Sequence, residues 1–226
     1  MKKITNIMIL AAGLGKRMKY YTKKKPKPLI KIDKETLIEK IIKNLEMNDF
    51  KKIVINIFYL KKKIKDLLNN KFKIKILFSD EKNLLDTGGG IKNALKLINS
   101  EEFFVINSDI ILDIKENPFV QLEKFWNKDK MDALLLLYPK GKNKGDFNLD
   151  SSNRILIDKR NLEYVFTGIQ ILKSNIFLKI KKKKFSLSIL YEKLIKKKKI
   201  FGIVYTGNWY HIGTLESLKD YKKMIL

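Results

Sequence analysis

Cysteine is absent from this sequence of 226 residues, and histidine occurs once, as His211. These absences exclude a disulfide framework, a thiolate metal site, a cysteine nucleophile and a cluster of imidazole ligands. Long apolar runs are missing as well. The opening MKKITNIMILAAG superficially imitates a signal peptide, but Thr5 and Asn6 interrupt it, and the apolar stretch 7–12 is too short. No run approaches the roughly 18 apolar residues of a membrane span, so a cytoplasmic protein without a membrane partner is expected.

Arginine is scarce in a chain that is otherwise strongly basic. The formal net charge is +25, yet only three of the 49 basic residues are arginine, the residue that nucleic-acid recognition favours. The chain also has 32 isoleucines and 18 asparagines against four alanines, and Lys, Ile and Asn share AT-rich codons. Genome composition therefore explains the charge, and no specific nucleic-acid partner is expected. A nucleic-acid-binding module stays as an alternative that rests on charge alone, and the positive field could help to gather anionic substrates.

Short apolar stretches alternate with helical patterns over the first part of the chain. The candidate strands are 4–10, 52–58, 74–78, 103–107 and 133–138, and the helical patterns are 36–47, 61–68, 90–98 and 119–126. This alternation is typical of a mostly parallel sheet covered on both faces, a Rossmann-like three-layer α/β fold. Later candidates are strands at 154–157, 164–172 and 200–205 and helices at 174–180, 186–195 and 215–224. One domain over residues 1–226 is expected.

The most informative segment is 10–29, LAAGLGKRMKYYTKKKPKPL. A buried strand that breaks into a glycine-rich turn exposes successive backbone N–H groups, which suit a phosphate chain. Arg17 and Lys27 would add positive charge from two directions. Met18 stands where the dinucleotide fingerprint needs its third glycine, and the spacing of a Walker-type loop is absent. An ordinary strand-to-helix turn is the alternative. The added charges favour a nucleoside triphosphate as the ligand.

Two further motifs follow candidate strands. The glycines of Asp86-Thr87-Gly88-Gly89-Gly90 precede a predicted helix and would let a flat ligand approach the backbone, although a capped, flexible helix entry is the alternative. In Asn107-Ser108-Asp109 the aspartate emerges from a strand end, where it is well placed to hold a hard cation over phosphates. A strand-end turn is the alternative there.

Taken together, these segments resemble the sugar-1-phosphate nucleotidyltransferases. The pattern A-A-G-x-G-x-R-M with P-K-P-L downstream carries the resemblance, and a W-x-x-x-G-T frame extends it from residue 7 to about residue 218. The resemblance implies a nucleotide-diphospho-sugar transferase type of fold, with a nucleotide-binding half over about 1–138 and a sugar-binding half over about 139–226. It also implies an enzyme whose substrates are a nucleoside triphosphate and a sugar 1-phosphate. Monomer and dimer both stay open.

Other segments resemble one subgroup of this family. G-D-F-N-L at 145–149, F-T-G-I at 166–169 and G-N-W-Y-H-I-G-T-L-E at 207–216 are similar to the uridylyltransferases that act on N-acetylmuramate 1-phosphate in peptidoglycan recycling. Related guanylyl- and cytidylyltransferases share most of this frame. UTP with N-acetylmuramate 1-phosphate is the first expectation, and a mannose- or heptose-1-phosphate guanylyltransferase is the alternative.

The resemblance also implies roles for individual residues. Those expected in catalysis are Arg17, Lys27 and Asp109. Those expected to bind the nucleotide are Leu10, Ala11, Ala12, Gly13, Gly15, Lys16, Glu81, Thr87, Gly88 and Gly89. Those expected to bind the sugar are Asp146, Asn148, Lys159, Thr167 and Gly168.

The expected metal ion is Mg²⁺, with Mn²⁺ as the other possibility, held by Asp109 and His211. Many relatives have an aspartate where His211 stands, and that aspartate is their second Mg²⁺ ligand. Mg²⁺ prefers oxygen, whereas imidazole suits Mn²⁺ or Zn²⁺. His211 would therefore ligate through nitrogen, or bind a phosphate through water while Asp109 holds the metal alone. A third reading is weakened activity, as in a nucleotide-sugar sensor.

Overall fold

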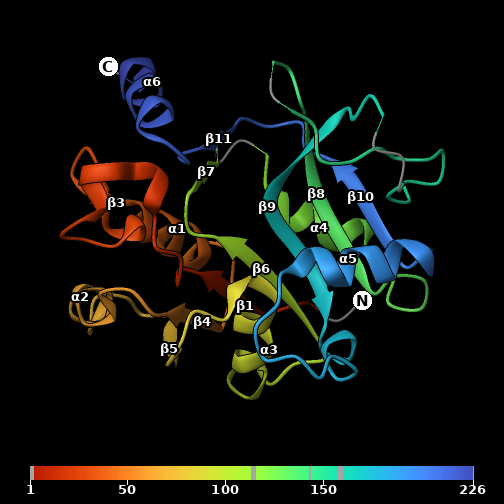
Figure 1. Ribbon diagram of the computed structural model, residues 1–226, viewed down its shortest axis with the longest axis horizontal. Helices are drawn as coiled ribbons and strands as arrows, with labels where there is room; N and C mark the ends of the chain where they lie inside the picture. The colour runs from red at the N-terminus through yellow and green to blue at the C-terminus, as the bar shows by residue number, and fades with distance from the viewer. Residues whose placement is uncertain (1–2, 113–115, 143, 157–159, 226) are drawn as a thin grey trace.

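The computed structural model describes residues 3–112, 116–142, 144–156 and 160–225. Within these ranges seven strands form one sheet in the order β10-β8-β9-β6-β1-β4-β5 (Figure 1). Their bounds are β1 Asn6–Leu10, β4 Lys52–Ile57, β5 Lys75–Asp80, β6 Glu102–Asn107, β8 Ala133–Pro139, β9 Tyr164–Lys173 and β10 Ile200–Val204. Strand β9 alone runs against its neighbours, because it pairs antiparallel with both β6 and β8. The expected mostly parallel α/β sheet is confirmed.

Helices cover both faces of this sheet (Figure 1). One face packs against α1 (Leu37–Glu46), α2 (Lys61–Leu68) and α4 (Pro118–Phe125). The other packs against α3 (Asp86–Ile98) and α5 (Leu187–Lys196). Alternation along β1 explains the two cores, because Ile7 and Ile9 belong to the first and Met8 to the second. None of the described helices combines the length and apolar character that crossing a membrane needs.

A smaller third core joins the two ends of the chain. Met18, in the 3₁₀ segment η1 (Lys16–Thr22), packs there with Leu218 of α6 (Leu215–Ile225). Figure 1 shows α6 beside the N-terminal segment that carries β3 (Glu35–Thr36), which pairs with β2 (Lys31–Ile32). A second small antiparallel pair joins β7 (Ile110–Leu112) to β11 (Trp209–His211). These contacts bring the glycine-rich turn, the end of β6 and the last helix to one edge of the sheet.

Three local expectations were wrong. The helix expected to begin at residue 90 begins at Asp86, so the three glycines lie inside α3. The helix expected over 174–180 is the short 3₁₀ segment η3 (Ser174–Phe177). In place of a strand at 154–157, Arg154 and Ile155 make only isolated bridges, and residue 157 lies outside the described ranges.

Candidate active site

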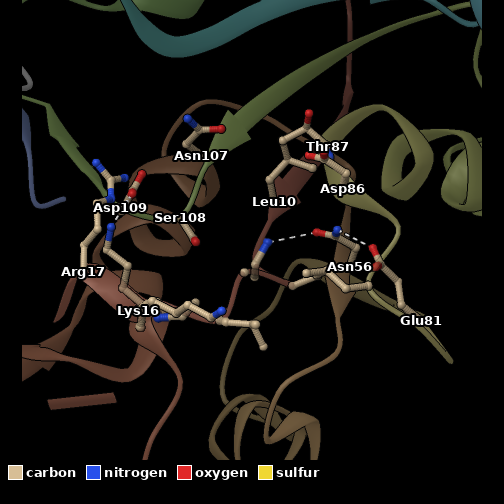
Figure 2. Close-up of a pocket in the computed structure, with 18 of the residues that line it drawn as sticks. Leu10, Lys16, Arg17, Asn56, Glu81, Asp86, Thr87, Asn107, Ser108 and Asp109 are labelled. Carbon is tan, nitrogen blue, oxygen red and sulfur yellow. Dashed lines mark hydrogen bonds and ion pairs between the residues drawn. The ribbon is translucent and has the colours of Figure 1, made fainter. Parts of the chain in front are cut away.

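A cavity of about 660 Å³ opens at the carboxyl ends of β1, β4 and β6 (Figure 2). Ligands bind at this edge in open α/β sheets. Its lining includes these residues expected from the sequence: Leu10, Ala11, Ala12, Gly13, Gly15, Lys16, Arg17, Lys27, Glu81, Thr87 and Asp109. It also includes residues to which the sequence assigned no individual role: Leu14, Pro28, Asn56, Leu84, Asp86, Asn107, Ser108, Lys184 and Gly213. One cavity thus brings together the glycine-rich turn, the start of α3 and the end of β6, which lie far apart in the chain.

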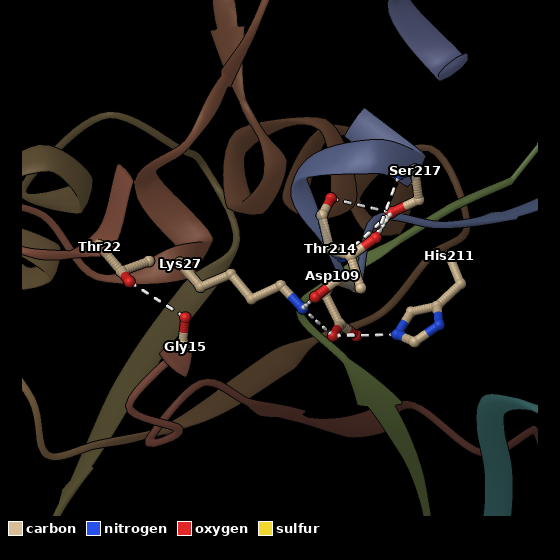
Figure 3. A network of polar contacts seen from close by, with 8 residues as sticks. Gly15, Thr22, Lys27, Asp109, His211, Thr214 and Ser217 are labelled. Carbon is tan, nitrogen blue, oxygen red and sulfur yellow. Dashed lines mark hydrogen bonds and ion pairs between the residues drawn. The ribbon is translucent and has the colours of Figure 1, made fainter. Parts of the chain in front are cut away.

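The turn after β1 is locked by its own backbone and by Thr22. Gly15 has a φ of +65°, and a Cβ there would lie 2.9 Å from the Thr22 methyl carbon. The Gly15 carbonyl accepts a hydrogen bond from the Met18 N–H at 2.8 Å. It also accepts one from the Thr22 hydroxyl at 3.0 Å (Figure 3). At Gly13, by contrast, a Cβ would meet open space. Gly15 therefore shapes the turn, while Gly13 leaves room in the cavity.

Lys27, Asp109 and His211 form a polar cluster beside this turn (Figure 3). The Lys27 ammonium donates to Asp109 Oδ2 and lies 3.5 Å from the Gly213 carbonyl oxygen. The same Asp109 oxygen lies 3.2 Å from His211 Nε2. Trp209 stacks on the imidazole ring with a 6.1 Å centroid separation. The cluster joins η2 (Lys27–Leu29), the turn after β6 and β11.

Burial and charge act against each other in this cluster. Burial lowers the pKa of Lys27, and Asp109 opposes that shift. Burial alone would raise the pKa of Asp109, but His211 and Lys27 together lower it below its usual range. Asp109 is therefore held as a carboxylate at the cavity wall. Such a group can neutralise a cation or orient a lysine towards an incoming phosphate.

Gly88 and Gly89 are buried and do not line the cavity. A Cβ on Gly88 would come within 2.4 Å of the Phe185 ring, and one on Gly89 within 2.3 Å of the Lys183 carbonyl oxygen. The Gly89 N–H donates to the Phe185 carbonyl at 3.0 Å. The Thr87 hydroxyl accepts from the Leu187 N–H at 2.9 Å. The glycines thus let the segment 183–187 dock on the first turns of α3.

The residues expected to bind the sugar stand apart from this cavity. Asp146 accepts from the Phe166 N–H at 2.9 Å, and Asn148 accepts from the Glu163 N–H at 2.8 Å. Besides Gly88 and Gly89, the expected site residues that the structure describes but that do not line the cavity are Asp146, Asn148, Thr167, Gly168 and His211. Lys159, the remaining residue expected to bind the sugar, lies outside the described residues.

Two of these residues connect indirectly to the cavity. Gly168 has a φ of +91°, and a Cβ there would lie 2.7 Å from Nδ2 of Asn107, which lines the cavity. The Thr167 carbonyl accepts from the Trp209 indole N–H at 2.9 Å, beside the His211 ring. Strand β9 therefore meets the cavity through Asn107 and the β11 segment.

Comparison with known proteins finds relatives that are similar over nearly the whole chain. A family model described as nucleotidyl transferase matches residues 6–226. The chain is 32% identical over 220 residues to the N-acetylmuramate alpha-1-phosphate uridylyltransferase of Neisseria meningitidis serogroup B, across 94% of this chain and 95% of that protein. It is 29% identical over 223 residues to the D-glycero-alpha-D-manno-heptose 1-phosphate guanylyltransferase of Campylobacter jejuni, across 92% and 95%.

Solved structures share the fold. HddC from Yersinia pseudotuberculosis complexed with GMP-PN superposes with a TM-score of 0.80 at 23% identity, across 99% of this chain and 100% of that chain. The UDP-glucose pyrophosphorylase complexed with UDP-glucose superposes with a TM-score of 0.82 at 17% identity, across 98% of each chain. The chain belongs to the nucleotidyl transferase family, which confirms the enzyme class that its sequence motifs predict.

Proposed function

We propose that this enzyme joins UTP to N-acetylmuramate 1-phosphate, forming UDP-N-acetylmuramate and pyrophosphate. The observation that carries the reaction class is the Lys27–Asp109 ion pair, which lies at the cavity wall beside the glycine-rich turn. The choice of substrates is supported by the Neisseria relative, which is similar over nearly its full length. We also propose that residues of about 1–138 bind the nucleotide and residues of about 139–226 bind the sugar. The proposal includes a cytoplasmic location and a role in peptidoglycan recycling.

The reaction needs no nucleophile from the protein. An oxygen of the sugar phosphate attacks the α-phosphorus of the triphosphate in line, and the bond to the bridging oxygen of the β-phosphate breaks as pyrophosphate leaves. The protein's task is then positioning and charge neutralisation. The turn over residues 13–15, with Lys16 and Arg17, holds the departing phosphates. Lys27 neutralises charge between the α-phosphate and the attacking phosphate.

Asp109 fits a divalent cation that is held largely by the substrate. Among the described residues, the hydrogen bonds and ion pairs of its carboxylate are made by Oδ2, which leaves Oδ1 for a ligand. The described residues contain no group of three or more His, Cys, Asp or Glu side chains arranged for a metal. Mg²⁺ is commonly bound through one or two carboxylates together with substrate phosphates. When bound, the ion would supply charge neutralisation along the phosphate chain, and His211 contacts Asp109 at Oδ2.

A pyrophosphate-release panel tests this proposal. UTP, CTP, GTP and dTTP are each combined with N-acetylmuramate, mannose and heptose 1-phosphates, with Mg²⁺ or Mn²⁺. We expect UTP with N-acetylmuramate 1-phosphate to give the highest kcat/KM. A preference for GTP with a heptose or mannose 1-phosphate would instead favour the alternative that the Campylobacter relative supports. No release with any pair would contradict the proposed reaction.

A further inference from the structure

A short chain of buried hydrogen bonds connects two walls of the cavity. The Ala11 N–H, just after β1, donates to Asn56 Oδ1 at 2.9 Å. Asn56 Nδ2 in turn donates to Glu81 Oε1 at 2.8 Å, and Glu81 Oε2 accepts from the Leu85 N–H at 2.9 Å, where α3 begins. Figure 2 shows the first two bonds as dashed lines on either side of the Asn56 amide. The glycine-rich turn and α3 are thus tied together.

The hydrogen bonds of this chain converge on Glu81, which only accepts, from Ala11 through Asn56 on one side and from Leu85 on the other. A carboxylate only accepts hydrogen bonds, so Glu81 turns the NH₂ side of the Asn56 amide towards itself. The oxygen of the same amide is then left facing the Ala11 N–H. With a neutral amide at position 81, one of the donors along this line would face another donor. The negative charge of Glu81 therefore decides which way Asn56 points.

Although Glu81 lines the cavity, it is almost fully buried and offers a substrate little surface. Only 2% of Glu81 and 3% of Asn56 are exposed. A Cβ on Gly90 would lie 2.7 Å from both Asn56 Nδ2 and Glu81 Oε1, so the third glycine of the D-T-G-G-G motif makes room for this bond. Burial raises the pKa of Glu81, and its bonds from Leu85 and Asn56 oppose that shift. Both carboxylate oxygens are already used within the protein.

We propose that Glu81 is a positioning residue for the nucleoside triphosphate and that it acts through Asn56 rather than by touching the base. It holds the Ala11 backbone and the start of α3 at a fixed separation, and the nucleotide binds between them. This inference rests on the proposed function, because it takes the cavity to be the nucleotide site. The bond chain lies on the wall away from Lys27 and Asp109. Its loss should therefore weaken nucleotide binding much more than the chemical step.

A polarity swap tests the proposal. In Glu81→Gln a donor faces a donor, and in Asn56→Asp two carboxylates face each other. We expect each single variant to raise the KM for UTP by about tenfold or more, with kcat changed by less than about threefold, as for an interaction made equally in the ground and transition states.

The double variant, Asn56→Asp with Glu81→Gln, restores the pairing with the two groups exchanged. The carboxylate introduced at position 56 accepts from the Ala11 N–H and from the NH₂ group of the amide introduced at position 81. The oxygen of that amide accepts from the Leu85 N–H. The net charge is unchanged, and we expect the KM for UTP to return to within about threefold of wild type.

A matched control separates positioning from loss of stability. The Tyr191 hydroxyl donates to Gln170 at 2.7 Å in the buried core, and neither residue lines the cavity. Tyr191→Phe removes one buried hydrogen bond there, so it should lower the thermal midpoint without changing the KM for UTP. A wild-type KM for UTP in Glu81→Gln would overturn the inference. So would a double variant whose KM for UTP is as high as that of the two single variants.

Calorimetric titration of UTP with Mg²⁺, without the sugar phosphate, separates the two proposals. If wild-type protein binds no nucleotide, the proposed function fails. If wild-type protein binds UTP and Glu81→Gln binds it equally well, only the positioning role fails. The expected result is a dissociation constant about tenfold higher in Glu81→Gln and restored in the double variant.

Discussion

Lys27 and Asp109 stand 82 positions apart in the sequence, yet their side chains form an ion pair that is nearly excluded from solvent. The exposed fractions are 10% for the Lys27 side chain and 16% for that of Asp109. One residue sits in a turn between two prolines, and the other follows the central strand β6. An ion pair in such a place contributes little net stability, because desolvation offsets the attraction. Its position at the cavity wall indicates a role in holding charged substrates.

Removing either partner should reduce turnover sharply. We expect Lys27→Met and Asp109→Asn each to lower kcat for pyrophosphate release by roughly 10² to 10³, the usual effect of losing one charged contact to a transition state. Lys173→Met is the matched control, because Lys173 pairs with Asp132 at 3.2 Å in a half-buried site away from the cavity. That control should retain wild-type kcat. Near-wild-type turnover in Asp109→Asn would contradict its assignment to the metal.

Two glycines should respond in opposite ways to the same added methyl group. Gly88→Ala places a Cβ against the Phe185 ring, so we expect a loss of about 1 to 3 kcal/mol in the free energy of unfolding. Gly13→Ala meets open space in the protein but projects into the cavity, so stability should hold while the KM for UTP rises. Urea unfolding and steady-state kinetics measure both effects. Equal stability of the two variants would show that the 183–187 segment does not press on α3.

Acid should destabilise the protein partly through Glu39. Burial alone would raise its pKa, but hydrogen bonds from Lys71 and Thr36 lower the pKa from 4.5 to about 2. A carboxylate whose pKa is lower in the folded protein stabilises the fold at pH values above its unfolded-state pKa. That contribution disappears as the pH falls from about 4.5 towards 2.

The variant Glu39→Gln removes this pH dependence. By linkage we expect it to be about 1 to 3 kcal/mol less stable than wild type at pH 6, with the difference shrinking at pH 2.5. Urea unfolding at both pH values measures it. The Thr36–Glu39 capping box at the start of α1 explains why so small a change should matter. A difference independent of pH would refute the assignment.

The sheet was predictable because its strands are continuous apolar runs, and such runs need no tertiary information to be found. The first turn of α3, which contains the three glycines, was not predictable in this way. Glycine has a low helix propensity, so glycines are not expected in a helix. Only the close approach of Phe185 to Gly88 and of Lys183 to Gly89 explains why a larger residue would not fit in this turn. Asn56 was missed for a related reason. It is one polar residue in a buried strand, and its importance depends on Glu81, which lies 25 positions away.

His211 offers the sharpest test of whether this chain is an adapted enzyme or a silent sensor. Its Nε2 lies 3.2 Å from Asp109, its ring stacks on Trp209, and a Cβ on Gly213 would meet that ring at 2.6 Å. The ring is thus fitted to its surroundings. In His211→Asp a second carboxylate replaces a group that lowers the pKa of Asp109, and the stack on Trp209 is lost. We therefore expect pyrophosphate release to fall by about tenfold or more with Mg²⁺ and with Mn²⁺. His211→Asn, which adds no charge, should fall less. A gain over wild type in His211→Asp would instead favour the nucleotide-sugar sensor.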